Sequence, residues 1–281
     1  MDIRTTRRLR DAASYFVLTL IAIVMIFPLF WMVSTSLKSL QQIVQFPPVW
    51  WPPEPVWRNY SDALTFQPFD RFARNTIVIV IFYVIGNLLS ATLIAYGFAR
   101  LRFPGRSVLF TIMLSTLMMP IIVRLVPLFL LYKELGWINT PLPLIVPAFF
   151  GEPFFIFLMY QFFKNIPSEL IEAARIDGSS ELGIWWRIML PLSKPALAAV
   201  VIFAFQHSWN DFLAPLIFLT RTESWTLSLG LVAFTAGAGE AVEFWHFLMA
   251  VSTTMVIPMI LVFLVAQRQF VQGISRVGLK G

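Results

Sequence analysis

The chain has 281 residues, of which 58% are hydrophobic and 13% are charged, and it contains 28 phenylalanines and 10 tryptophans. Soluble domains are about half apolar and about a quarter charged, so this composition excludes an ordinary soluble protein and indicates a membrane protein. The chain has no cysteine, which excludes disulfides, thiol catalysis and cysteine-ligated zinc. Basic residues at the cytoplasmic ends of membrane spans explain the net charge of +6 better than a nucleic-acid partner does.

Six apolar segments are long enough to cross a bilayer, which takes about 20 mostly apolar residues. In chain order they cover residues 12–33, 76–98, 107–132, 141–163, 196–220 and 244–266. Four arginines precede the first segment, as in a signal peptide, but its apolar run is too long and no small-residue cleavage site follows. We therefore expect an all-α polytopic membrane protein with six transmembrane helices.

The distribution of basic residues predicts the orientation of these spans. Fourteen of the 21 lysines and arginines fall at the two termini and in the connections between spans two and three and between spans four and five, whereas six fall on the other side. Cytoplasmic segments carry the excess of basic residues. We therefore expect both termini, and the connection between spans four and five, to lie in the cytoplasm.

A segment rich in proline and tryptophan follows the first span. Residues 41–62 (QIVQFPPVWWPPEPVWRNYSDA) contain five prolines and three tryptophans. Proline keeps such a segment extended, and tryptophan is favoured at the membrane interface. The segment is therefore either an extracellular docking surface or an interfacial anchor.

Two charged residues lie within the third and fourth spans. Ionisable residues in a membrane are costly and usually functional. Arg124 and Glu152 are expected at similar depths, and Glu152 sits in the sequence Gly151-Glu152-Pro153, which should break the fourth span. We expect either a buried ion pair between Arg124 and Glu152 or two side chains that point separately into water, with Glu152 contacting the substrate.

The connection between spans four and five, residues 168–191, reads as a helical hairpin. Ser168 is a plausible N-cap of a first helix, and Gly178 is placed to end that helix in the left-handed conformation. Ser179 or Ser180 can cap a second helix that Pro191 ends. In that second helix, four apolar residues form one stripe facing the bilayer or the other spans: Leu182, Trp185, Trp186 and Met189.

The tip of this hairpin carries few bulky side chains. Ala173, Ala174 and Gly178 would let another backbone approach closely, and Glu172 offers one charge to an arginine or lysine. The residues alone fit equally a docking element for a partner and a tightly packed hairpin without one.

The fifth span contains a polar face. At 100° per residue, Gln206, His207, Asn210 and Asp211 fall within one arc of about 140°. Such a face would either line a path for hydroxyl-rich solutes or hold the span against other helices. We favour the path for Gln206 and Asn210, and packing for Trp209 and Asp211. Only two histidines are present, and we expect no metal site and no catalytic residue.

The hairpin resembles the EAA loop of ABC importer permeases. The matching residues are Glu172-Ala173-Ala174, three residues, Gly178, nine residues, and Ile188-Met189-Leu190-Pro191. The segments AYGFARLRFPGR, LGWINT, SWNDFLAPLIFLT and QRQFVQGI are also similar to the carbohydrate-importer branch, in particular to the second permease of maltose-type and glycerol-phosphate-type systems.

This resemblance implies one permease domain over residues 1–281, with a core region at 72–268 and a coupling loop at 168–191. It also implies that a short coupling helix in the loop docks on a cytoplasmic ATPase through Glu172, Ala173, Ala174, Asp177 and Gly178. The implied partners are a paralogous permease, two ATPase subunits or domains, and an extracellular solute-binding protein. The chain itself would bind no cofactor, and its partners would use ATP.

We therefore expect a multi-pass subunit of a bacterial or archaeal cell membrane that imports a sugar or oligosaccharide, with Gln206, Asn210 and Glu152 along the path. One alternative is an ABC permease for another polar solute, such as a glycerol phosphodiester. The other is a self-sufficient secondary transporter, which would need internal repeats and membrane-embedded acids for ion coupling; the sequence shows no repeat and few such acids.

Overall fold

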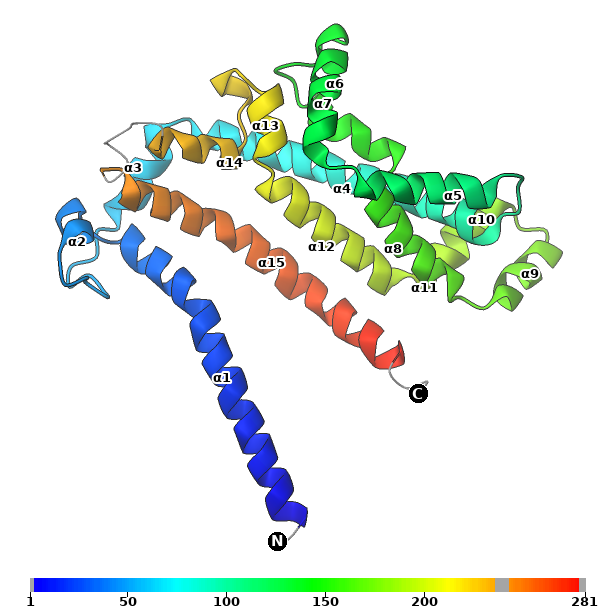
Figure 1. Cartoon of the computed structure of the whole chain (residues 1–281), viewed down its shortest axis with the longest axis horizontal. Helices are drawn as coiled ribbons and strands as arrows, with labels where there is room; N and C mark the ends of the chain where they lie inside the picture. The colour runs from blue at the N-terminus through cyan, green and yellow to red at the C-terminus, as the bar shows by residue number, and fades with distance from the viewer. Residues whose placement is uncertain (1–2, 236–242, 278–281) are drawn as a thin grey trace. The chain divides into compact units, whose positions relative to one another are not determined.

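The computed structural model describes residues 3–235 and 243–277, and every regular element within these ranges is a helix (Figure 1). The chain divides into two compact units. One consists of Met1–Phe69 and Leu231–Ile257, and the other of Asp70–Gly230 and Pro258–Gly281. Residues of both predicted cytoplasmic termini lie outside the described ranges, among them Met1, Lys280 and Gly281. The predicted orientation of the spans in the membrane remains an expectation.

Four helical segments are long and apolar enough to cross a membrane, and the number rises to six if each of two bent helix pairs is one span. The four are Arg10–Ser36, Phe69–Arg100, Leu142–Lys164 and Trp245–Val265, and the bent pairs are Arg106–Met118 with Ile121–Glu134 and Glu181–Leu192 with Lys194–Asn210. Each predicted span thus has a helical counterpart, and the chain is an all-helical multi-span membrane protein.

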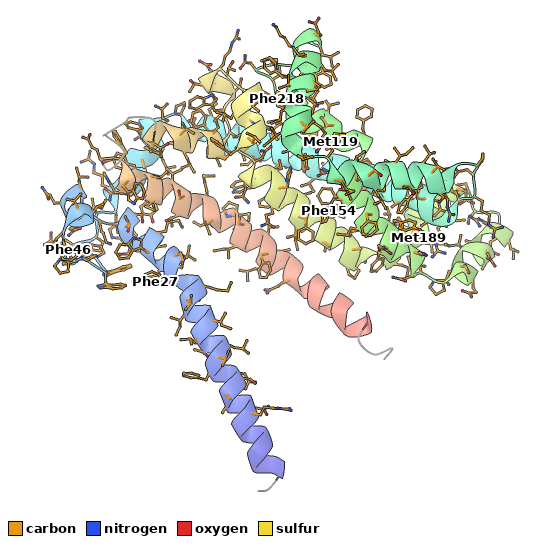
Figure 2. The ribbon with its side chains drawn as sticks, viewed as in Figure 1. Phe27, Phe46, Met119, Phe154, Met189 and Phe218 are labelled. Carbon is orange, nitrogen blue, oxygen red and sulfur yellow. The ribbon has the colours of Figure 1, made fainter. Side chains whose placement is uncertain are left out.

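The unit that begins with α1 (Ile3–Ser36) also contains α2 (Leu40–Val44), α3 (Arg58–Phe66), the 3₁₀ helix η5 (Leu231–Phe234) and the start of α15 (Trp245–Val277). Large apolar side chains are exposed along most of α1 and project on several sides (Figure 2). An exposed apolar helix of this kind suits a lipid environment.

The proline- and tryptophan-rich segment folds back on the end of α1. The Asn59 side chain donates hydrogen bonds to the carbonyl oxygens of Ser36 and Lys38, both at 2.9 Å. The Trp50 ring lies 5.9 Å from the Trp31 ring, measured between centroids. The Lys38 ammonium lies 3.9 Å from the centre of the Trp31 ring, and its burial lowers the pKa of Lys38. These contacts order the segment, whose remaining tryptophan surface is exposed.

The second unit contains the remaining helices. They are α4 (Phe69–Arg100, which begins one residue before the unit), α5 (Arg106–Ser115), η1 (Thr116–Met118), α6 (Ile121–Glu134), α7 (Leu142–Ile145), η2 (Val146–Phe150), α8 (Pro153–Lys164), α9 (Ser168–Ile176), α10 (Glu181–Ile184), the π-helix η3 (Trp185–Met189), α11 (Leu190–Leu192), α12 (Lys194–Asn210), α13 (Leu213–Phe218), η4 (Thr222–Ser224) and α14 (Leu227–Gly230).

The predicted third span is sharply bent rather than straight. Its two halves, α5 with η1 and then α6, meet at 101° across Met119 and Pro120. Met119 is extended, with φ −80° and ψ 116°. Proline disfavours the helical conformation in the residue before it and has no amide hydrogen to continue the hydrogen-bond ladder, so the sequence Met119-Pro120 accounts for the bend.

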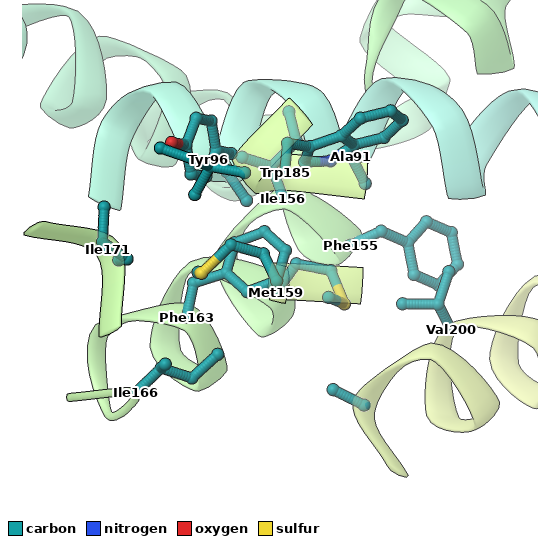
Figure 3. Close-up of a cluster of buried hydrophobic side chains, with 14 of the residues drawn as sticks. Ala91, Tyr96, Phe155, Ile156, Met159, Phe163, Ile166, Ile171, Trp185 and Val200 are labelled. Atoms are coloured by element: carbon teal, nitrogen blue, oxygen red, sulfur yellow. The ribbon is translucent and has the colours of Figure 1, made fainter. Parts of the chain in front are cut away.

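The core of this unit lies where α4, α8, η3 and α12 meet. Ala91 and Tyr96 of α4, Met159 of α8, Met189 of η3 and Val200 of α12 are all buried in one cluster, most of which Figure 3 shows. Small residues on α4 leave room for the large side chains of α8. The cluster extends into the hairpin that follows α8 and thereby ties the hairpin to the spans.

Candidate functional site

The predicted hairpin of residues 168–191 is present, with α9 and α10 joined by a tight turn. Gly178 has φ +79°, its amide donates to the Arg175 carbonyl at 3.0 Å, and the Ser179 amide donates to the Ala174 carbonyl at 2.9 Å. This is the hydrogen-bond pattern of a Schellman motif, which requires a left-handed residue after the helix. The Ser180 side chain accepts from the Gly183 amide at 3.2 Å. The glycine cap and the serine cap predicted from the sequence are both confirmed.

Two details of the hairpin differ from the sequence-based expectation. Pro167, not Ser168, precedes the first helical residue, and the Ser168 side chain makes no capping bond because Ser168 is itself helical. The expected apolar stripe is split: Trp185 and Met189 are buried, whereas Leu182 and Trp186 are 67% and 61% exposed. The π-helical turn from Trp185 to Met189 adds about one residue to that turn and shifts the register that a 3.6-residue period assumes.

The five predicted coupling residues do not share one environment. Ala174 is 8% exposed and belongs to the buried cluster, whereas Glu172, Ala173, Asp177 and Gly178 are exposed. Ala174 therefore anchors the hairpin, and the other four form its accessible surface. Ile176, which was not among the predicted coupling residues, is 86% exposed and lies on this same surface.

Polar contacts between segments distant in the sequence also hold the hairpin against the end of α4. The Tyr96 hydroxyl donates to Glu181 Oε2, and Arg175 Nε donates to Glu181 Oε1 at 2.7 Å, which raises the pKa of Arg175. The Arg100 guanidinium donates to the carbonyls of Phe163 and Ile166. Displacement of α9 and α10 would therefore pull on α4 and on the end of α8 (Figure 1).

The three predicted path residues lie around one cavity of about 710 Å³. Glu152 comes from the start of α8, and Gln206 and Asn210 from the last turn of α12. Phe154, labelled in Figure 2, and Phe212 add aromatic rings to the lining and are 43% and 41% exposed. The cavity therefore combines acceptors and donors with exposed rings.

A second cavity of about 320 Å³ adjoins the first, since Glu152, His207 and Asp211 line both. The Tyr83 hydroxyl donates to Glu152 Oε2 at 2.5 Å, and the Tyr83 and His207 rings are stacked with centroids 5.7 Å apart. The polar residues between the two cavities are therefore held in place by α4.

The proposed ion pair between Arg124 and Glu152 is wrong. Both residues line the smaller cavity. Among the described residues, however, no ion pair with an N–O distance of 4.0 Å or less joins Arg124 to Glu152. Glu152 accepts a hydrogen bond from Tyr83 instead. The expected depth of Arg124 assumed a straight third span, whereas the bend at Met119-Pro120 changes the course of α6 and hence the position of Arg124.

The expected fifth span also ends earlier than its apolar composition indicated. The helix α12 stops at Asn210, and Asp211 is extended, with φ −63° and ψ 123°. Asp211 Oδ1 accepts a hydrogen bond from the Ala214 amide, in the first turn of α13, at 3.3 Å. Asn210 donates to the Gln206 carbonyl at 2.9 Å. The break before α8, at Glu152, and the break between α12 and α13, at Asp211, therefore both border the cavities.

Broken helices whose ends border polar cavities are typical of membrane transport proteins. The sequence model of binding-protein-dependent transport system inner membrane components matches residues 88–276. A diacetylchitobiose uptake system permease protein (NgcG) of Streptomyces coelicolor is 33% identical, over 94% of this chain and 87% of its own length. An arabinooligosaccharides transport system permease protein (AraQ) of Bacillus subtilis is 31% identical, with 93% of each chain covered.

The fold agrees with these sequence matches. A chain in the crystal structure of a bacterial ABC transporter involved in the import of the acidic polysaccharide alginate superimposes with a TM-score of 0.81. The two are 25% identical, with 94% of this chain and 98% of that chain covered. The protein belongs to the family of binding-protein-dependent ABC transporter inner-membrane permeases. It is a permease subunit, and ATP hydrolysis lies on partner subunits.

Proposed function

We propose that this chain forms part of the path by which an ABC importer moves a sugar or oligosaccharide into the cell. The cavity beside Glu152, Gln206 and Asn210 carries this proposal, since it offers a carboxylate, two amides and aromatic rings. Sugars need hydrogen-bond partners for their hydroxyls and an apolar surface for their ring faces. The relatives named for oligosaccharide transport support the same substrate class.

The proposed assembly contains a paralogous permease, two ATPase subunits or domains, and an extracellular binding protein that delivers the solute. Gln206 and Asn210 are exposed in the isolated chain, although α12 is apolar over most of its length. Exposed amides within a membrane span are unfavourable unless water or protein covers them. A water-filled cavity between two permeases would satisfy them.

The hairpin surface formed by Glu172, Ala173, Ile176, Asp177 and Gly178 is the proposed docking site for the ATPase, with both termini of the permease on the same, cytoplasmic side. This docking proposal is supported by the burial pattern of the hairpin, whose tip is exposed and whose other residues include some that pack in the core. Ala174 and Met189 are packed in the core, and Glu181 is bonded to both Tyr96 and Arg175. Force applied at the tip would therefore reach α4 and α8.

Cysteine labelling tests the path. Because the natural chain has no cysteine, Gln206→Cys and Asn210→Cys in the assembled transporter are expected to react with a membrane-impermeant thiol reagent in at least one step of the transport cycle. The control is Ala204→Cys, two residues earlier in α12, where the side chain is 0% exposed. We expect that cysteine to stay unlabelled. Protection of both test positions in every step would show that they are packing residues.

A further inference from the structure

A third cavity lies at the end of α4, away from the residues assigned to the path. Its volume is about 880 Å³. The lining comes from the last turn of α4, the turn to α5, and the hairpin helices α9 and α10: Ala99, Arg100, Leu101, Arg102, Phe103, Arg106, Ser168, Ile171, Glu172, Arg175 and Glu181. On the proposed orientation, this cavity opens at the cytoplasmic surface of the membrane.

The lining carries an excess of positive charge. It includes four arginines and two glutamates, and one of each, Arg175 and Glu181, neutralise each other through a two-pronged contact. Arg102 is exposed and makes no hydrogen bond or ion pair to any residue that the structure describes. Arg106 uses Nη1 on the Leu101 carbonyl at 3.1 Å, and a guanidinium has five N–H donors. Arg102 and Arg106 therefore retain donors for an anion.

Two helix N-termini add to this positive potential. The helices α5, of 10 residues, and α9, of 9 residues, begin at Arg106 and Ser168, and both residues line the cavity. Neither helix has a side-chain cap at its start. Their first amides are left without intrahelical acceptors, and the helix dipoles favour a negative group. A phosphate beside two arginines would satisfy this arrangement.

An apolar surface adjoins the basic cavity. Phe103 lines the cavity, and the first turns of α5 expose Val108 (63%), Leu109 (52%) and Ile112 (57%). A free phosphate or a nucleotide needs no such surface, whereas a phospholipid needs both a basic site for its headgroup and an apolar surface for its acyl chains. We propose that this cavity binds the phosphate of an anionic phospholipid from the cytoplasmic leaflet, with the acyl chains lying along α5.

The test compares lipid retention by the assembled transporter and by two variants. Wild-type complex, Arg102→Gln/Arg106→Gln and Arg187→Gln are reconstituted in nanodiscs of phosphatidylglycerol or phosphatidylcholine, and retained lipid is measured by native mass spectrometry. Arg187 is exposed in the segment after the hairpin turn but does not line the cavity. We expect the double variant to retain phosphatidylglycerol about tenfold more weakly, and Arg187→Gln to retain it normally.

Three results would overturn the proposal. Equal retention by the double variant and by the wild type would show that the cavity does not hold the lipid. Competition by inorganic phosphate at millimolar concentration, without selective retention of phosphatidylglycerol, would assign the cavity to a free anion. Release of the ATPase subunit from the double variant, with lipid retention unchanged, would make the cavity a protein contact. Thermal unfolding of both variants close to the wild-type temperature keeps the comparison valid.

Discussion

Gly178→Leu is expected to reduce ATP-driven solute uptake and binding-protein-stimulated ATP hydrolysis by about tenfold or more, equivalent to about 1.4 kcal/mol or more of lost coupling energy. A Cβ atom added at Gly178 would meet no atom of this chain within 4 Å. The leucine side chain would therefore project from the exposed tip into the space that a docked ATPase must occupy. The left-handed conformation, with φ +79°, adds about 1–2 kcal/mol of local strain.

A matched substitution separates this strain from the loss of docking. Gly136 follows the end of α6, has φ +69°, and likewise has no atom within 4 Å of an added Cβ. Gly136→Leu therefore imposes a similar backbone strain far along the chain from the hairpin, and we expect it to leave coupled uptake nearly unchanged. If Gly178→Leu transported as well as Gly136→Leu, the tip of the hairpin would not be the docking surface.

Gly151→Ala is expected to destabilise the protein by about 3 kcal/mol, the combined size of a strained backbone and an overpacked core. Gly151 has φ +95° and ψ 118°, a conformation that residues with a side chain rarely adopt. An added Cβ would lie 2.5 Å from Ile94 Cδ1 and 3.0 Å from Ile156 Cδ1. The break before α8, which places Glu152 at the cavities, therefore requires glycine.

The measurement is the thermal unfolding temperature of the purified protein in a fixed detergent. Gly97→Ala is the control, because Gly97 lies within the helix α4 and an added Cβ there would meet nothing within 4 Å. Alanine is about 1 kcal/mol better than glycine inside a helix, so the control should unfold at the same temperature or a higher one. Equal unfolding temperatures for Gly151→Ala and Gly97→Ala would contradict the proposed constraint.

Much of this architecture could be predicted because its signals are local. Apolar length identified segments that correspond to the helices, and Gly178 and Ser180 cap the hairpin as their positions indicated. The grouping of Glu152, Gln206 and Asn210 around one cavity also follows a simple rule. Costly polar groups in an apolar environment are placed together, where water or solute can reach them.

The remaining features depend on contacts between distant segments. The bend at Pro120 alters the direction of α6. A local sequence pattern also could not show that Tyr83, 69 positions away in the chain, donates a hydrogen bond to Glu152. The anchoring role of Ala174 and the exposure of Ile176 depend on which face of α9 meets the core.

The most direct test of the central claim is uptake by proteoliposomes that contain this chain, the paralogous permease and the ATPase subunits. Radiolabelled oligosaccharide is supplied outside with its binding protein, and ATP is enclosed or omitted. We expect uptake only when ATP and the binding protein are both present, with no response to an imposed proton gradient. Uptake by this chain alone, driven by a proton gradient without ATP, would contradict the account and identify a secondary transporter.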